Sequence, residues 1–195
     1  MFKRVIGSLI MLFSLLNAED INAQIAQGIS FVSEKSGVPR SVYFTLIDIE
    51  SSFYPYVICT VMESSKANDM KILTHRGYEV RINPYKLKNL VSIYARDEKS
   101  IVQLSKELIK QGLSIDMGLM QVNSQNISPG EIDRIFDPYY NIARGSNILA
   151  GCAEKYNGDI KASIECYNKG FVRKETYDYY AKFIKSYNQN FGAKR

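Results

Sequence analysis

From residue 21 onward, apolar residues recur at intervals of three and four, which is the pattern of amphipathic helices. Spaced apolar positions over residues 21–36 predict a first helix, and Gly37 ends it. Pro39 then opens a second helix that runs to about Ser51, because proline is tolerated in a first helical turn.

A carboxylate continues the apolar row of this second helix. Tyr43, Leu46 and Ile47 stand three and four residues apart, and Glu50 follows at the same spacing. A carboxylate on the apolar face of a helix is desolvated, which raises its pKa and lets it hold a proton near neutral pH. The alternative is that Glu50 lies at a fraying helix end and points to water. The spacing alone does not choose between them.

The middle of the chain is less regular. Residues 72–74 and 78–82 flank His75-Arg76-Gly77, which predicts a β-hairpin with glycine in the turn, and Pro84 is expected to end the second strand. The remainder of residues 56–96 shows no clear periodicity.

Helical patterns return in the second half of the chain, where aspartates stand at three expected helix starts and glycines at the expected ends. The predicted helices are Asp97–Gln111, Asp137–Tyr156, Asp159 to about Gly170, and about Thr176–Tyr187. The expected fold class is therefore mainly α, of the α+β kind, with one small β-hairpin.

The first residues have the pattern of an export signal. Lys3 and Arg4 precede an apolar stretch over residues 5–16, and Ala18 closes a plausible cleavage site. An uncleaved anchor is the alternative, but the stretch is shorter than the roughly 20 residues of a membrane span. We therefore expect a signal peptide over 1–18, a single mature domain over 19–195, and a periplasmic protein.

Composition excludes several classes of function. Cleavage would remove two of the 25 basic residues, which leaves a net charge of +3 against 20 acidic residues, without a basic block, so no nucleic-acid partner is expected. His75 is the single histidine, which excludes a multi-histidine metal site, and no metal or cofactor is expected. Of three cysteines, Cys152 and Cys166 stand seven residues either side of a predicted interhelical turn at Asp159, which suggests a disulfide and leaves Cys59 unpaired.

Three short segments carry the candidate chemistry, and further fragments follow the same order along the chain. The three segments are Glu50-Ser51, Gly118-Leu119-Met120-Gln121 and Tyr167-Asn168-Lys169-Gly170. The supporting fragments are Ser52–Pro55, Asp116–Ser124, Asp137-Pro138 with Asn141-Ile142 and Gly145, and Glu175-Thr176-Tyr177 with Tyr179. Together they resemble the Slt-type lytic transglycosylases, relatives of goose-type lysozyme, and in particular the small kind found in conjugation and type IV secretion systems. The resemblance covers about residues 35–187 and implies a lysozyme-like helical domain.

The resemblance implies an enzyme that cleaves the MurNAc-GlcNAc β-1,4 bonds of peptidoglycan glycan strands. Such enzymes use one glutamate, here Glu50, first as acid toward the leaving oxygen and then as base toward the 6-hydroxyl, which gives a 1,6-anhydromuramic acid product. Ser51 is expected to make a local hydrogen bond to the backbone.

The other two segments are expected to form the substrate groove. Gly118 would allow close backbone approach, Met120 would pack on a sugar face or fill the core, and Gln121 would bind substrate or brace the site. Tyr167 would bond to the glutamate or to an N-acetyl group. Asn168 would hold the loop, cap the helix end, or do both.

Two departures from the family pattern stand out. Cys166 replaces the usual alanine before Tyr-Asn, with little effect expected. Residues 56–112 make the interval between Glu50 and Gly118 longer than in compact members, so they are predicted to be an insertion that forms either an arm over the groove or additional packing.

Two other functions are compatible with the sequence, a non-catalytic binding protein and a hydrolase. A non-catalytic peptidoglycan-binding assembly factor would keep the groove, although it would have no need of a desolvated carboxylate. A lysozyme-type hydrolase would need a second carboxylate, for which Asp116 is the candidate. The expected partners are peptidoglycan strands and components of a secretion or conjugation machine, and the protein is expected to be a monomer. The sequence does not choose between endo and exo cleavage.

Overall fold

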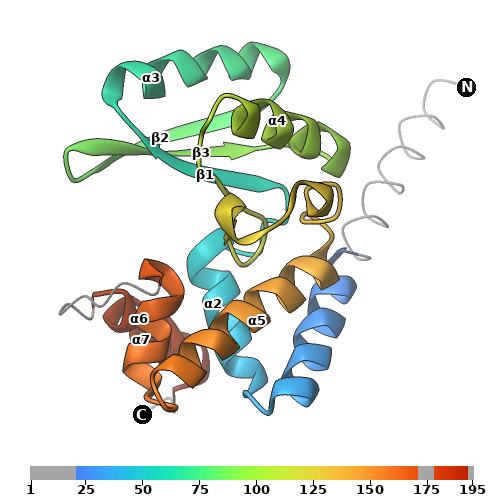
Figure 1. The fold of residues 1–195 in the computed structure, drawn as a ribbon, viewed down its shortest axis with the longest axis vertical. Helices are drawn as coiled ribbons and strands as arrows, with labels where there is room; N and C mark the ends of the chain where they lie inside the picture. The colour runs from blue at the N-terminus through green and yellow to red at the C-terminus, as the bar shows by residue number, and fades with distance from the viewer. Residues whose placement is uncertain (1–20, 171–177, 193–195) are drawn as a thin grey trace, which may run out of the picture.

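The chain folds around two hydrophobic cores, one among helices and one beside an antiparallel sheet (Figure 1). The computed structural model describes residues 21–170 and 178–192. The predicted class is confirmed, since the described part is mainly helical with a smaller sheet. The predicted signal peptide over 1–18 lies outside the described residues. Within those residues, no helix has both the length and the apolar character needed to cross a bilayer.

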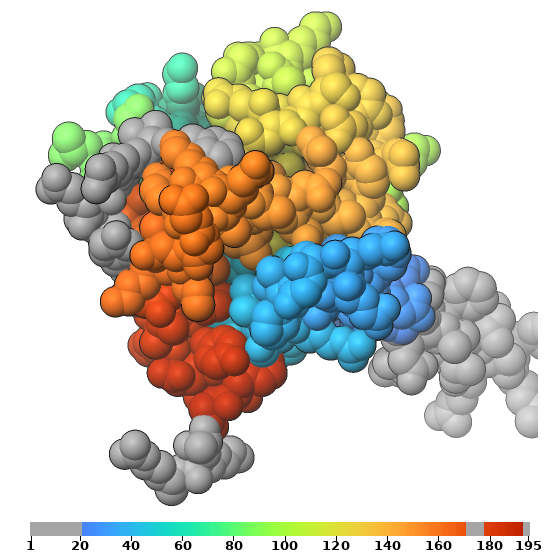
Figure 2. Space-filling model, turned by 60° about the horizontal axis from the view of Figure 1, so that its bottom comes forward, coloured from blue at the N-terminus to red at the C-terminus, as the bar shows by residue number. Residues whose placement is uncertain are grey.

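The helical half is built around α2 (Arg40–Ser51), whose Tyr43, Leu46 and Ile47 are buried at 1%, 0% and 0% exposure. The helices that surround it are the helix over residues 21–36, α5 (Pro138–Lys155), α6 (Ile160–Lys169) and α7 (Asp178–Phe191). Seen from the end of this half, the blue helix over 21–36, orange α5 and α6, and red α7 form one continuous surface (Figure 2). The apolar row of α2 therefore marks the centre of the helical core, as its period predicts.

Side-chain caps fix where the later helices begin. The carboxylates of Asp97, Asp137 and Asp159 accept hydrogen bonds from backbone N–H groups three residues on, at 2.7–2.9 Å. Each such bond satisfies a donor that the first helical turn leaves free. The three predicted helix starts are therefore confirmed.

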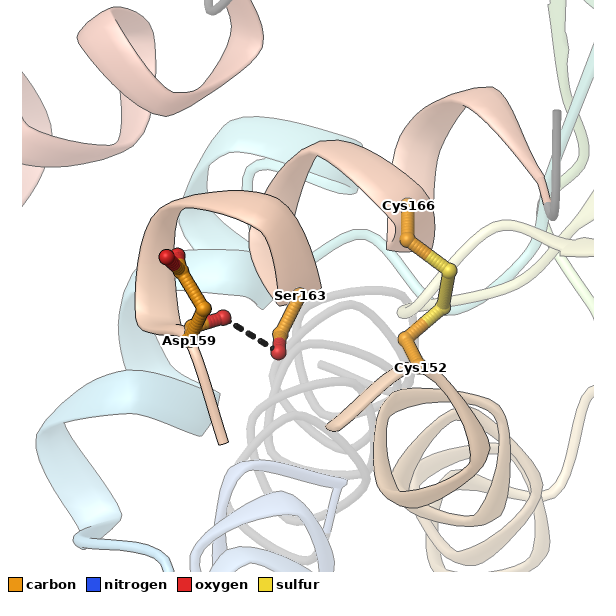
Figure 3. Close-up of a disulfide and its surroundings, with 4 residues drawn as sticks. All are labelled: Cys152, Asp159, Ser163 and Cys166. Carbon is orange, nitrogen blue, oxygen red and sulfur yellow. Dashed lines mark hydrogen bonds between the residues drawn. A yellow bond between two sulfur atoms is a disulfide. The ribbon is translucent and has the colours of Figure 1, made fainter. Parts of the chain in front are cut away.

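The disulfide between Cys152 and Cys166 is confirmed, with Cα atoms 5.7 Å apart. It joins α5 to α6 across the turn at Asp159 (Figure 3). In the first turn of α6, the Ser163 hydroxyl donates a hydrogen bond to the Asp159 carbonyl at 2.6 Å. Through the disulfide, the Cys166 side chain ties the Tyr167-Asn168 segment to α5.

The sheet half is larger than the one hairpin that the sequence predicts. Its strands lie in the order β2-β3-β1-β4-β5, and every neighbouring pair is antiparallel. Their bounds are β1 Val57–Met62, β2 Glu79–Tyr85, β3 Lys88–Tyr94, β4 Asp116–Met117 and β5 Val122–Asn123. The helical pieces of this half are α3 Ser64–Asp69, α4 Glu98–Lys110, and the 3-10 turns η1 Met70–Arg76, η2 Ser124–Asn126 and η3 Pro129–Glu131.

The predicted position of the hairpin is wrong. His75-Arg76-Gly77 ends the 3-10 helix η1, where Gly77 takes a positive φ of 88° as its cap, and the hairpin turn lies instead between β2 and β3. Pro84 does not end β2, because β2 is the outer strand of the sheet and a proline there need not donate to a neighbour.

The sequence pattern also missed β1. Four of its six residues are buried, so it has the composition of a covered central strand and no alternation of apolar and polar residues. Through β1 and β3, the 56–112 stretch supplies Ile58, Val91 and Ile93 to the sheet core, all at 0% exposure. These residues pack in the core, while the boundaries of a separate insertion stay a prediction.

The two cores meet at the tight turn between β4 and β5. Met117 and Val122 at its edges belong to the sheet core, whereas Leu119 and Met120 at its tip belong to the helical core. Since α2 also ends at this junction, the Gly118–Gln121 segment and Glu50 are brought to the same part of the molecule.

Candidate active site

Glu50 lies in the last turn of α2, and its side chain reaches α7. The residue is half-buried, and its carboxylate accepts a hydrogen bond from the Tyr179 hydroxyl. Directly afterwards the chain leaves the helix through Ser52 and Phe53, both at positive φ (51° and 63°). The structure therefore places Glu50 between two helices instead of at a frayed end in open solvent.

The surroundings of Glu50 favour its protonated form. Burial raises the pKa of Glu50 to about 7, outweighing the hydrogen bond from Tyr179 and the nearby charge of Lys182, both of which lower it. The negative charge of Asp116 raises the pKa further. A carboxyl group with this pKa is present in both protonation states near neutral pH and can both give and take a proton.

Asp116 is the second carboxylate of this region. It lies in β4 opposite Cys59 of β1, and Asn123 donates a hydrogen bond to its Oδ1 at 2.7 Å. Burial raises the pKa of Asp116, and the Asn123 bond partly opposes this. The negative charge of Asp116 is a minor cause of the raised pKa of Glu50.

Gly118 permits a turn that no other residue would fit. Its φ is +74°, its N–H donates to the Val57 carbonyl at 2.9 Å, and a Cβ here would lie 2.4 Å from Nδ2 of Asn141. Asn141, fully buried on α5, clamps the turn: its Nδ2 donates to the Met117 carbonyl at 2.9 Å, and its Oδ1 accepts from the Met120 N–H at 2.7 Å. Gly118 and Asn141 therefore form one structural unit.

The prediction that Met120 packs on a sugar face needs correction. Its side chain is buried at 0% exposure, and a Cβ on Gly145 of α5 would lie 2.6 Å from its sulfur. Met120 thus fills the helical core, which is the second of the two roles expected for it. The absence of a side chain at Gly145 leaves the space that the Met120 side chain occupies.

Gln121 is held by its own turn. It has a positive φ of 46°, and its Nε2 donates to the Gly118 carbonyl at 2.7 Å. Its Oε1 is buried and has no hydrogen-bond partner within the described residues. This arrangement agrees with a bracing role, and substrate contact stays a prediction.

Tyr167 does not bond to Glu50 as the sequence suggested. Its hydroxyl donates to the Met120 carbonyl at 2.6 Å, so it supports the back of the Gly118–Gln121 turn. Its pKa lies well above the usual value, first because of burial and then because of the charges of Glu50 and Asp116. Asn168 is exposed in the last turn of α6, and its role stays a prediction.

Tyr179, which contacts Glu50 directly, is the residue to which sequence reasoning gave no chemical role. It is 7% exposed and stands four residues before the buried Phe183, so the helical period could have placed it on the inner face of α7. Lys182, on the same helix, donates to the Ile49 carbonyl at 2.9 Å. These contacts bind α7 to the end of α2.

An ionic cluster that is buried at its Glu165 end and exposed at Asp178 holds the start of α7 on α6. Glu165 is 5% exposed; its Oε1 accepts the Tyr180 N–H at 2.6 Å, and its Oε2 lies 2.5 Å from the Lys169 ammonium. Lys169 also bonds to Asp178. Because Tyr179 lies between two residues of this cluster, the cluster determines where the tyrosine meets Glu50.

Ser51 and Cys59 make hydrogen bonds within the protein. The Ser51 hydroxyl donates to the Ile47 carbonyl at 3.1 Å, which is the expected local bond. The free Cys59 donates to Ser92, and burial raises its thiol pKa to about 11, so the thiolate that nucleophilic chemistry needs is scarce at neutral pH. In residues 21–170 and 178–192, no three His, Cys, Asp or Glu side chains gather as a metal site would require.

A known protein family matches the part of the chain that forms this site. The transglycosylase SLT domain family matches residues 28–190, which include Glu50, the Gly118–Gln121 turn, Asn141, Tyr167 and Tyr179. No match was found among solved structures. The chain belongs to the SLT-domain family and is a lytic transglycosylase, a lyase that acts on peptidoglycan.

Proposed function

We propose that Glu50 is the acid and the base for cleavage of the MurNAc-GlcNAc β-1,4 bond, with a 1,6-anhydromuramic acid product. The observation that carries this proposal is a half-buried carboxyl group with a pKa of about 7, held by Tyr179 at the junction of the two cores. Such a group is available as a proton donor near neutral pH and becomes a base once it has lost the proton.

The two steps exchange one proton each. Protonated Glu50 donates its proton to the glycosidic oxygen, the bond from this oxygen to the anomeric carbon breaks, and the leaving sugar departs as an alcohol. The Glu50 carboxylate then takes the proton of the 6-hydroxyl of the same muramic acid, whose oxygen bonds to the anomeric carbon. Glu50 ends protonated, as it began, and no water is consumed.

Tyr179 and Lys182 favour the state between the two steps. The Tyr179 hydroxyl donates to the Glu50 carboxylate, and the positive charge of Lys182 lowers the pKa of the same group. Both interactions are stronger with the ionised carboxylate than with the neutral acid. They keep the pKa from rising so far that Glu50 would no longer release its proton.

Asp116 is the group that a hydrolase mechanism would need. An inverting hydrolase uses a second carboxylate as a base toward water. Here the Oδ1 of Asp116 already accepts a hydrogen bond from Asn123, which leaves one oxygen less to act on water. This bond favours Asp116 as a positioning and electrostatic group beside Glu50, with the anhydro product formed by Glu50 alone.

The place of action proposed for this enzyme is the periplasm, after export and removal of residues 1–18. The Cys152–Cys166 disulfide supports this, because such bonds persist in oxidising compartments. We further propose that the enzyme acts as a monomer to open the wall locally for a secretion or conjugation machine, on the strength of the family resemblance.

A Glu50→Gln variant tests the proposal. It should clear a suspension of sacculi at least 100-fold more slowly than the wild type, because it removes the proton donor, while it still sediments with them. Glu154→Gln, at an exposed position on α5, is the matched control and should clear at the wild-type rate. Equal clearing by the Glu50→Gln variant would favour a binding protein whose groove is not catalytic.

A further inference from the structure

A pocket of about 300 Å³ opens where the chain leaves α2 and reaches the sheet. Its walls include Tyr54, Tyr78, Glu79, Tyr94 and Arg96. These residues come from the loop after α2, the start of β2 and the end of β3, where Glu79 pairs with Tyr94 across the two strands.

The pocket lies near the end of α2 that carries Glu50. Tyr54 follows Glu50 by four residues, so their Cα atoms are at most about 14 Å apart. Tyr54 is 44% exposed, and its ring meets the ring of Tyr94 edge to face, with centroids 5.2 Å apart. A group attached to a muramic acid next to the cleaved bond could therefore enter this pocket.

One positive charge in the pocket is not neutralised. Glu79 is paired with Arg81 at 2.7 Å, and the guanidinium carbon of Arg81 lies over the Tyr94 ring, 4.5 Å from its centroid. Asp97, next in sequence to Arg96, accepts hydrogen bonds from the backbone and hydroxyl of Ser100. In the part of the chain that the structure describes, the Arg96 guanidinium makes neither an ion pair nor a hydrogen bond.

We propose that this pocket binds the peptide stem of peptidoglycan, with Arg96 holding one of its carboxylates and Tyr54 and Tyr94 packing against its apolar atoms. The inference rests on the proposed function and adds a specificity determinant to it. A peptide stem carries carboxylates, whereas GlcNAc and stem-bearing MurNAc carry no charge, because the lactyl carboxyl group is an amide where the stem is joined. An unpaired guanidinium beside aromatic rings matches the charged and apolar parts of the stem.

Binding is measured in the Glu50→Gln background, so that the probes survive. The probes are soluble GlcNAc-MurNAc oligomers with their tetrapeptide stems, and the same oligomers after an amidase has removed the stems and the freed lactyl carboxyl groups have been capped as methylamides. Arg96→Gln should weaken binding to stem-bearing oligomers about tenfold and leave binding to stem-free oligomers unchanged. Lys86→Gln is the matched control: it removes one positive charge at the opposite end of the β2–β3 hairpin and should affect neither probe.

Two results would overturn the proposal: an equal loss of binding to both probes, or no loss with either. Arg96 is exposed, so its replacement should leave the fold intact, and the melting temperature of the variant checks this. Failure of the proposed function is a separate result, namely that the unmodified enzyme cleaves neither kind of oligomer. The binding comparison still gives its answer in that case, because it does not depend on turnover.

Discussion

The hydroxyl of Tyr179 donates a hydrogen bond to Oε1 of Glu50, although 129 residues separate them in the sequence. The bond joins the start of α7 to the end of α2. The two helices have opposite effects on the pKa of Glu50: burial at the end of α2 raises it, and the hydrogen bond from Tyr179 on α7 lowers it. The pKa of about 7 is the result of both.

The pH dependence of activity follows from this balance. The free enzyme must hold a proton on Glu50, so kcat/KM should fall as pH rises through about 7. Tyr179→Phe removes an interaction that lowers the pKa, so this fall should move to higher pH. The rate should also drop by about tenfold or more, because the carboxylate formed in the first step loses a charge-assisted bond.

Tyr139→Phe, at an exposed position on α5, is the control for the tyrosine substitution and should keep the wild-type pH profile. A Tyr179→Phe profile that falls at the same pH as the wild type, or at a lower pH, would contradict the role given to this bond.

Glu50 should destabilise the folded protein above neutral pH. Its folded-state pKa is raised above the unfolded value, so the folded state binds the proton more tightly, and stability is lost as pH rises from about 4.5 to about 7. Glu50→Gln removes this loss, and its unfolding free energy should exceed that of the wild type by up to about 3 kcal/mol at pH 8. Urea denaturation at pH 8 and pH 4.5 measures it; an equal difference at both pH values would refute the linkage.

The Gly118 turn should tolerate no side chain. Gly118→Ala adds a Cβ at positive φ, 2.4 Å from Asn141 Nδ2, and would break hydrogen bonds that hold the turn. We expect a loss of more than about 2 kcal/mol of unfolding free energy, measured by urea denaturation. At Gly130 a Cβ would meet no atom within 4 Å, so Gly130→Ala should differ from the wild type by about 0.5 kcal/mol or less.

The Cys152–Cys166 disulfide should stabilise the fold by about 3 kcal/mol, since it closes a loop of 14 residues in the unfolded chain. The double variant Cys152→Ala/Cys166→Ala should lose this amount in urea denaturation. Reductant should lower the stability of the wild type and leave the double variant unaffected. A wild type that is insensitive to reductant would argue against a bond that matters for folding.

Sequence patterns found the elements whose signals are local. The aspartate caps at 97, 137 and 159 and the apolar row of α2 each depend on neighbours within one or two turns, so they could be read directly. The sheet could not, because β1 is specified by its pairing with β3 and β4, far away in sequence. The hairpin was misplaced because Gly77 ends a 3-10 helix with the same positive φ that a hairpin turn would use.

The site was predicted in the same uneven way. The position of Glu50 at the end of the apolar row could be predicted from the period of one helix. The interactions of Met120 and Tyr167 could not, because they depend on where α5 and α6 pack against the β4–β5 turn. The contact of Tyr179 with Glu50 likewise requires the fold, since it depends on how α6 and the Glu165 cluster set the start of α7.

Mass spectrometry of the soluble products from purified sacculi tests the central claim most directly. A single carboxyl group that serves as acid and then as base predicts muropeptides that end in 1,6-anhydromuramic acid, lighter by one water molecule than the hydrolysis products. Products that end in reducing muramic acid would show that water attacks the anomeric carbon, and would contradict the account in which Glu50 completes both proton transfers alone.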